Sequence, residues 1–196
     1  SSITYSDLIR GSGSIVLSGS GALNFSEEMT YTGNTTLEGS ANLYILTDGG
    51  LPDSSAITMG TSYGDNTSIT FDVSDTIGSL SGSVDGADAA ISLSYSDTIL
   101  TISPNSGSTT FTGSISGMGG VAKAGAGTQT LSGRLSQGTL SVSAGTLIIT
   151  NSSNNYSTTS ISGGTLQSGD DSATGTGKIT MTGGQLSSNG TSARTF

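Results

Sequence analysis

The 196-residue sequence contains no cysteine, no histidine and no tryptophan. Without cysteine the chain has neither a disulfide framework nor a thiol nucleophile, and without histidine it lacks the side chain that most often acts as a general base. No run approaches the roughly 18 apolar residues of a membrane-spanning helix, so we expect no membrane insertion. The sequence begins with Ser1 and shows no signal peptide, from which we expect a processed form or an excised piece.

Charge is also scarce, and it is unevenly distributed. Charged residues make up 10% of the sequence, and the net charge is −9. Because nucleic-acid phosphates are bound by Lys and Arg, we expect no nucleic-acid partner. Residues 1–100 contain twelve acidic residues and one basic residue, Arg10, whereas residues 101–196 contain two acidic and four basic residues. The first half therefore has a net charge of −11 and the second half of +2.

Serine, threonine and glycine together supply about half of the residues. Such a composition is common in low-complexity chains, but disordered chains lack β-branched residues at periodic positions. Here strand-like runs recur, such as "SIVL" (14–17), "SITFDV" (68–73) and "TILTIS" (98–103). No helical periodicity is visible. The sequence therefore predicts a folded all-β protein.

Internal similarity indicates a repeat architecture. The segments "YTGNTTLEGSANLYI" (31–45), "SQGTLSVSAGTLIIT" (136–150) and "YSTTSISGGTLQS" (156–168) each combine short strands with a small-residue corner. A second element containing Ile-Thr-Met recurs in "SSAITMG" (54–60) and "TGKITMTGGQL" (176–186). Self-similarity at this period is typical of solenoids, in which each coil buries its apolar side against its neighbours.

We therefore expect one β-solenoid domain over residues 1–196, with repeat-like elements near 9–60, 76–150 and 156–196. Eight to ten coils at about 4.8 Å each would give a rod of roughly 40–50 Å. Side chains should alternate along each strand, and glycine should occupy the tight corners. The inward side chains of one coil are then predicted to be Leu140, Val142, Leu147 and Ile149.

One family resembles this pattern, the autotransporter-associated β-strand repeat proteins. The similarity lies in "KAGAGTQTLSG" (123–133), followed by "GTLSVSAGTLII" (138–149), and in "TIGSLSG" (76–82) with "TTFTGSISGMGG" (109–120). A degenerate copy is "IRGSGSIVLSG" (9–19), in which Arg10 replaces the lysine of the repeat. The resemblance implies a right-handed parallel β-helix, secretion and exposure at a bacterial cell surface, often within an autotransporter passenger.

Candidate catalytic and metal sites are weak. Glu27 and Glu28 are adjacent and would point to opposite faces of a strand, and Asp170-Asp171 lies in a turn-like stretch. Asp48, Asp65 and the Asp170-Asp171 pair offer oxygen ligands suited to calcium, but none lies in a calcium-binding motif. We assign no catalytic residue, no cofactor and no metal. Outward threonines in "TGTGKITMTGG" and "STTF" leave ice binding, and the fold leaves polysaccharide chemistry, as lesser alternatives.

The sequence instead predicts a non-catalytic structural or adhesive protein of the bacterial cell surface. Both ends of the sequence have the repeat pattern, and the acidic half of one copy would meet the basic half of the next. We therefore expect copies to stack head to tail into a filament. An adhesin or spacer segment of a longer polypeptide, which would bind host or neighbouring-cell surface molecules, is the alternative. The residues predicted to join the copies are Ile3, Tyr5, Leu8, Ile179, Met181, Leu186 and Phe196.

Overall fold

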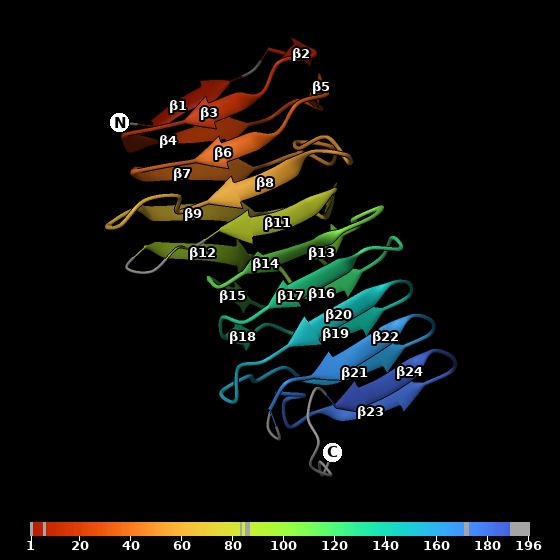
Figure 1. Ribbon diagram of the computed structural model, residues 1–196. Helices are drawn as coiled ribbons and strands as arrows, with labels where there is room; N and C mark the ends of the chain where they lie inside the picture. The colour runs from red at the N-terminus through yellow and green to blue at the C-terminus, as the bar shows by residue number, and fades with distance from the viewer. Residues whose placement is uncertain (1, 6, 83, 85–86, 171–172, 189–196) are drawn as a thin grey trace.

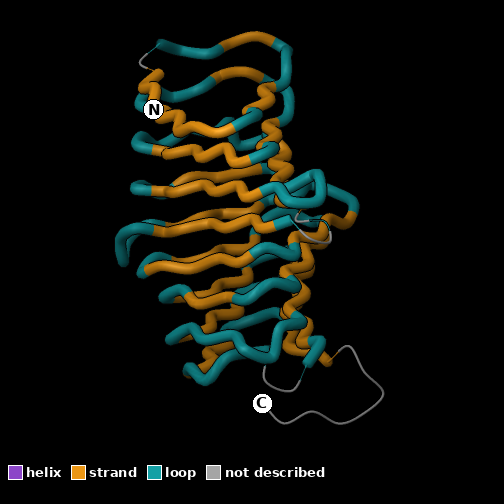
Figure 2. Tube along the Cα trace, turned by 90° about the vertical axis from the view of Figure 1, so that its left-hand side faces the viewer, coloured by secondary structure: helices purple, strands orange, loops and turns teal. Residues whose placement is uncertain are grey.

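The computed structural model describes residues 2–5, 7–82, 84, 87–170 and 173–188, with side chains from residue 7 onward. All elements in this part of the chain are β-strands, and every strand pairing is parallel. The described part of the chain winds through nine turns, which stack into a rod with strands running across it (Figures 1 and 2). The predicted all-β parallel solenoid is confirmed, and nine turns lie within the predicted range.

Three sheets build the rod, and sheet III has a strand in every one of the nine turns. Sheet I contains β1 (Ser2–Tyr5), β4 (Ser20–Phe25), β7 (Ser40–Ile45), β9 (Asn66–Phe71), β12 (Asp88–Leu93), β15 (Ser114–Gly117) and β18 (Leu135–Ser136). Sheet II contains β10 (Asp75–Ile77), β13 (Ile99–Ile102), β16 (Gly120–Lys123), β19 (Thr139–Val142), β21 (Thr158–Ile161) and β23 (Lys178–Met181). Sheet III contains β3 (Ile15–Leu17), β6 (Thr35–Leu37), β8 (Ala56–Met59), β11 (Ser79–Gly82), β14 (Ser108–Phe111), β17 (Thr128–Leu131), β20 (Thr146–Ile149), β22 (Thr165–Ser168) and β24 (Gln185–Ser188).

A complete turn visits sheets I, II and III in that order, and three corners connect them. In the first two turns the place of sheet II is taken by a separate pair, β2 (Arg10–Gly11) and β5 (Thr30–Tyr31). Stacked partners in sheet III are as few as 18 residues apart, between Gln129 and Leu147, and as many as 29, between Gly82 and Phe111. The longer turns place their extra residues in the corners, because the paired strands keep their register.

Alternation along each strand builds the core. Leu140, Val142, Leu147 and Ile149 are all at most 1% exposed, which confirms their predicted inward direction. Each inward residue stacks on the residue at the same position in the next turn, as Leu147 does on Leu166. A single turn cannot bury its inward apolar side chains by itself. The contacts between stacked turns therefore supply the hydrophobic stabilisation of the rod.

Glycine is required where sheet II turns into sheet III. Gly145 has φ of 61°, in the left-handed region that L side chains rarely adopt. A Cβ on Gly145 would overlap the carbonyl oxygens of Gly125 and Gly127 in the preceding turn. The backbones of successive turns therefore approach so closely at this corner that no side chain fits between them. This close approach explains Gly125 and Gly127, the glycines of "KAGAGTQTLSG" (123–133) that lie against Gly145.

Sheet III has one weak junction. Between β11 and β14 only Gly82 and Phe111 are paired, whereas β14 and β17 pair over four residues. The fully buried Gln129, from β17, reaches past β14 to the backbone of Leu80: its Nε2 donates to the Leu80 carbonyl at 2.8 Å, and its Oε1 accepts from the Leu80 N–H at 3.2 Å. A side-chain amide thus replaces the missing backbone partners.

The two Ile-Thr-Met elements do not occupy equivalent places. Ile57 and Met59 lie in β8 of sheet III, whereas Ile179 and Met181 lie in β23 of sheet II. The expectation that the two segments are copies of one structural element was therefore wrong. Both segments satisfy the same local requirement, an apolar residue at every second position, which all three sheets share.

Candidate assembly surfaces

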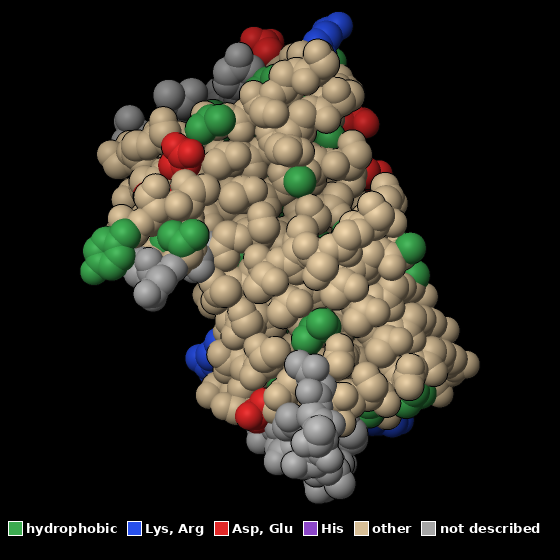
Figure 3. All heavy atoms as spheres, viewed as in Figure 1, with side chains coloured by type: hydrophobic (Ala, Val, Ile, Leu, Met, Phe, Trp, Pro, Cys, Tyr) green, Lys and Arg blue, Asp and Glu red, His purple; other side chains and the backbone are tan. Residues whose placement is uncertain are grey.

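The outer face of sheet III carries no charged residue in the described part of the chain. Figure 3 shows this face with charged side chains only at its margins. The outward positions, in chain order, are Val16, Thr36, Ala56, Thr58, Ser79, Ser81, Ser108, Thr110, Thr128, Thr130, Thr146, Ile148, Thr165, Gln167, Gln185 and Ser187. Hydroxyl side chains dominate this face, but Ala56, Ile148 and the two glutamines interrupt the columns. These sheet III positions, which include "STTF", therefore form no regular threonine lattice, whereas the other segment considered for ice binding lies at β23 of sheet II.

Acidic residues gather instead at the corner between sheets I and II. Glu27 and Glu28 are exposed there in the second turn, Asp48 and Asp53 in the third, and Asp97 in the fifth. Among the described residues, no group of three or more His, Cys, Asp or Glu side chains has metal-binding geometry. This corner therefore carries negative charge, but its described acidic residues do not form a set of metal ligands.

Asp65, one of the residues considered for calcium, has a structural role. Its Oδ1 accepts a hydrogen bond from the Gly39 N–H at 2.9 Å, and its Oδ2 accepts one from the Ser62 N–H at 3.0 Å. The carboxylate therefore closes the corner between sheets III and I, where two backbone N–H groups would otherwise lack partners. Asp171, the second residue of the other acidic pair, lies outside the described residues.

At the N-terminal end of the rod, β1 continues the columns of sheet I. Ile3 is in register with Leu23, and Tyr5 is in register with Phe25. Leu8, in the corner after β1, is 39% exposed. The backbone register thus gives Ile3 and Tyr5 the strand positions of Leu23 and Phe25, and their role at a joint between copies stays a prediction.

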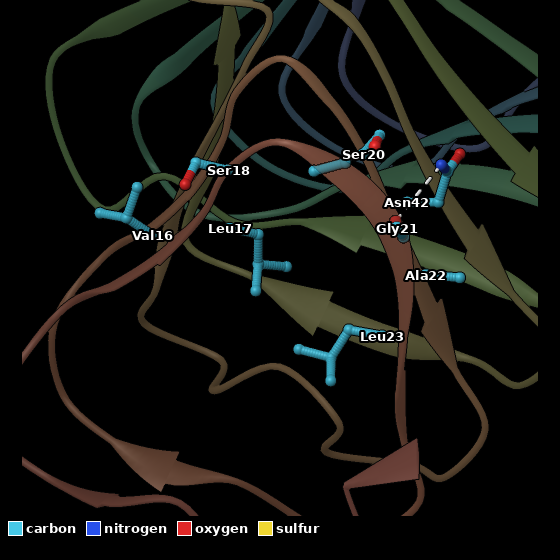
Figure 4. Close-up of a pocket in the computed structure, with 9 residues that line it drawn as sticks. Val16, Leu17, Ser18, Ser20, Gly21, Ala22, Leu23 and Asn42 are labelled. Atoms are coloured by element: carbon cyan, nitrogen blue, oxygen red, sulfur yellow. Dashed lines mark hydrogen bonds between the residues drawn. The ribbon is translucent and has the colours of Figure 1, made fainter. Parts of the chain in front are cut away.

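A cavity of about 360 Å³ opens at this end between β3 and β4. Leu17 and Leu23, both half-buried, point into the same space in Figure 4, and Val16, which also lines the cavity, is 58% exposed. The side-chain amide of Asn42 crosses the rim and donates to the carbonyl oxygens of Ser40 and Gly21. The first turn is therefore less tightly closed than the interior turns.

At the C-terminal end, β23 and β24 are the last strands that the structure describes. Ile179 and Leu186 are half-buried and Met181 is 46% exposed, although equivalent residues one turn earlier, such as Ile161 and Leu166, are fully buried. These side chains lose their cover because no described strand lies beyond them. Phe196, the last predicted contact, lies outside the described residues.

The sequence prediction missed a buried lysine. Lys123 is 1% exposed, and its ammonium donates to the carbonyl oxygens of Ala124, Gly125 and Ala144, at 2.8 Å for Gly125 and 3.3 Å for Ala144. Burial lowers the pKa of Lys123. The alternation of Val121 and Lys123 along β16 was the available signal, since both positions point inward. The lysine of the repeat-like motif therefore holds two glycine-rich corners together.

The described residues contain no helix long and apolar enough to cross a membrane. Comparison with known protein families, with curated proteins and with solved structures returns no match.

Proposed function

We propose that this chain is a non-catalytic structural protein of the bacterial cell surface, and that its copies stack head to tail into an extracellular filament. The observation that carries the proposal is the pairing of sheet III at the two ends. Within the described residues, β3 pairs only with β6, and β24 pairs only with β22. Within this described part, each strand therefore presents an unpaired parallel edge, which is a template for another strand of the same kind.

The two edges match in register. The column through Ile15, Thr35 and Ile57 leads, turn by turn, to Leu166 and Leu186. Stacking β24 of one copy on β3 of the next would continue this column and place Leu186 against Ile15. It would also bring Met181 of β23 towards the first turn of the second copy, covering a side chain that is 46% exposed.

Charge favours the same polarity. Lys178 is exposed at the start of β23, beside the corner between sheets I and II, and Asp7 is exposed in the same corner of the first turn. Head-to-tail stacking brings these two corners together. An exposed ion pair contributes no more than about 1 kcal/mol, so its effect is to select the polarity of stacking. A head-to-tail contact of this kind propagates instead of closing.

Disulfide trapping tests the joint directly, because the native chain has no cysteine. In the proposed register Ser187 lies beside Val16, both pointing outward, at the roughly 4.8 Å strand spacing that a disulfide can bridge. A mixture of Val16→Cys and Ser187→Cys copies should form a dimer of twice the 19.3 kDa chain mass on mild oxidation. The matched control replaces Ser187→Cys by Gln185→Cys, which is two residues out of register on the same face.

Efficient trapping of the Ser187 pair, with little trapping of the Gln185 pair, would support the register. Equal trapping of both pairs, or a monodisperse monomer at millimolar concentration, would refute the stacking. If the stacking is correct, electron micrographs of the untagged protein should show fibres about as wide as one solenoid.

The spacer or adhesin alternative accounts for the same edges, because adjoining turns of a longer polypeptide would cover them. The mass of the native protein separates the two. A filament subunit should run near 19.3 kDa, whereas a passenger segment should belong to a much larger chain. Antibody labelling of intact cells should place either form outside the cell.

A further inference from the structure

Sheet II is interrupted in the third turn of the solenoid. Residues 46–55, which connect β7 to β8, pass the place of sheet II without forming a strand. We call this stretch the third-turn segment; it is the orange loop beside β5 and β8 in Figure 1. Its Leu51 is fully buried and fills the core where a strand residue would otherwise lie. The segment thus covers the core in the third turn without the backbone hydrogen bonds of a paired strand.

The side-chain carboxyl of Asp75 makes hydrogen bonds to the backbone where the β-ladder is missing. Asp75, the first residue of β10, is 3% exposed. Its Oδ2 accepts a hydrogen bond from the Leu51 N–H at 2.9 Å, and its Oδ1 accepts one from the Thr76 N–H at 2.8 Å. Elsewhere the segment is held by backbone bonds at its edges, from Met29 to Gly49 and from Gly78 to Ser55.

The charged groups that act on Asp75 are acidic, namely Asp48 and Asp53 of the segment. With Glu28 from the second turn and Thr76, these two residues line a cavity of about 370 Å³. Tyr31 of β5 lies on the core side and donates or accepts a hydrogen bond with the Thr35 hydroxyl. On the fifth-turn side, Ser74 donates to the backbone carbonyl of Asp97, whose side chain lines the neighbouring cavity. None of these described groups is a lysine or an arginine.

We propose that the third-turn segment is a pH-sensitive latch, closed while Asp75 is neutral and released when Asp75 ionises beside Asp48 and Asp53. Release would uncover the core beneath Leu51 and the facing edges of β5 and β10. The latch belongs to the interior of the rod, so it is independent of the end-to-end stacking proposed above.

The direction of the effect follows from proton linkage. Burial, together with the neighbouring Asp48 and Asp53, raises the pKa of Asp75 against the opposing effect of its two N–H donors, and the resulting pKa is about 7. Once the segment opens and water reaches the carboxyl, the pKa returns toward its ordinary value of 3.8. The closed state therefore binds a proton that the open state releases, and opening becomes more favourable as the pH rises between about 4 and 7. A shift of about three units corresponds to an increase of about 1,000-fold in the opening equilibrium.

Hydrogen exchange read by mass spectrometry measures this opening. After correction for the intrinsic pH dependence of exchange, protection of a peptide covering residues 46–55 should fall at least 30-fold between pH 5 and pH 8. A peptide covering β20 should keep its protection. Asp75→Asn removes the ionisable group while retaining an acceptor oxygen, and the fall should disappear in this variant.

Two further variants keep the test decisive if Asp75→Asn does not fold. Asp53→Asn removes one of the repelling charges and should reduce the fall and shift it to lower pH. Asp97→Asn, an exposed acid in the corner of the fifth turn, is the matched control and should behave as the native chain. Constant protection of the native segment from pH 5 to pH 8, or an unchanged fall in Asp75→Asn and Asp53→Asn, would overturn the proposal.

Discussion

Replacement of Gly145 by alanine tests whether the glycine-rich corner is as tightly stacked as described. Gly107 supplies a matched control, since it also precedes an outward strand residue at the corner between sheets II and III. Gly107 has φ of 75° and Gly145 has φ of 61°, so alanine suffers similar backbone strain at both positions. The surroundings differ: an added Cβ at Gly107 meets nothing within 4 Å, whereas at Gly145 it meets two backbone carbonyl oxygens.

The expected costs follow from these surroundings. Left-handed backbone costs alanine about 1–2 kcal/mol, and the loss of unfolded-chain freedom returns about 0.4–1 kcal/mol. Gly107→Ala should therefore destabilise by about 1 kcal/mol or less. Gly145→Ala adds about 1–3 kcal/mol for overpacking. It also displaces the Lys123 ammonium, which lies 2.8 Å from the added Cβ, and hydrogen bonds to a charged group contribute about 1.5–3 kcal/mol. We expect a total near 4 kcal/mol.

Thermal unfolding followed by circular dichroism measures the difference. For a chain of this size each kcal/mol lowers the midpoint by about 2–4 °C. Gly145→Ala should therefore unfold about 8–16 °C below the native chain and Gly107→Ala within about 4 °C of it. Equal midpoints for the two variants would show that the corner has room for a side chain, and the account of the glycine stack would fail.

Three further substitutions probe the core and the buried polar residues. Leu147→Ala should destabilise by about 2–5 kcal/mol through cavity formation, whereas Ile148→Ala on the outer face of the same strand should cost less than about 1 kcal/mol; similar losses in urea denaturation would place the register in error. Gln129→Leu should cost about 2–4 kcal/mol, because it leaves the buried N–H and C=O of Leu80 without partners, and a stability equal to that of the native chain would contradict the bridging role. Asp65→Ala should cost about 1–3 kcal/mol by freeing two N–H groups, and unchanged hydrogen exchange at the Gly39 N–H in this variant would contradict the corner-closing role.

The alternation of side chains was predictable from the sequence, but the sheet in which each strand lies was not. An apolar residue at every second position marks a strand and its inward face, and Leu140, Val142, Leu147 and Ile149 were assigned correctly on that basis. All three sheets impose the same alternation. The chain therefore contains no local signal that distinguishes β8 from β23, and the two Ile-Thr-Met elements were treated as equivalent.

The buried polar residues show a second limit. Alternation places Lys123, Gln129 and Asp75 inward as surely as their apolar neighbours, since each lies two residues from a buried apolar residue of its strand. Each has at least one backbone partner in another turn, namely Ala144, Leu80 and Leu51 respectively, and these distant partners have no sequence signature. The direction of these side chains could be predicted, whereas the contacts that satisfy them depend on the lengths of the intervening corners. Of the predicted end residues, Ile179, Met181 and Leu186 lie at an open end, and their role in assembly stays a prediction.

The single residue pair between β11 and β14 has a mechanical consequence. At the same level of the rod, sheet I is joined by six residue pairs between β9 and β12, and sheet II by three between β10 and β13. Bending that stretches sheet III is resisted at this level by one residue pair and by the hydrogen bonds of the Gln129 amide. Bending in the opposite sense stretches sheets I and II, which more residue pairs join. The rod should therefore be more compliant in one direction than in the others, with its flexure concentrated between the fourth and fifth turns.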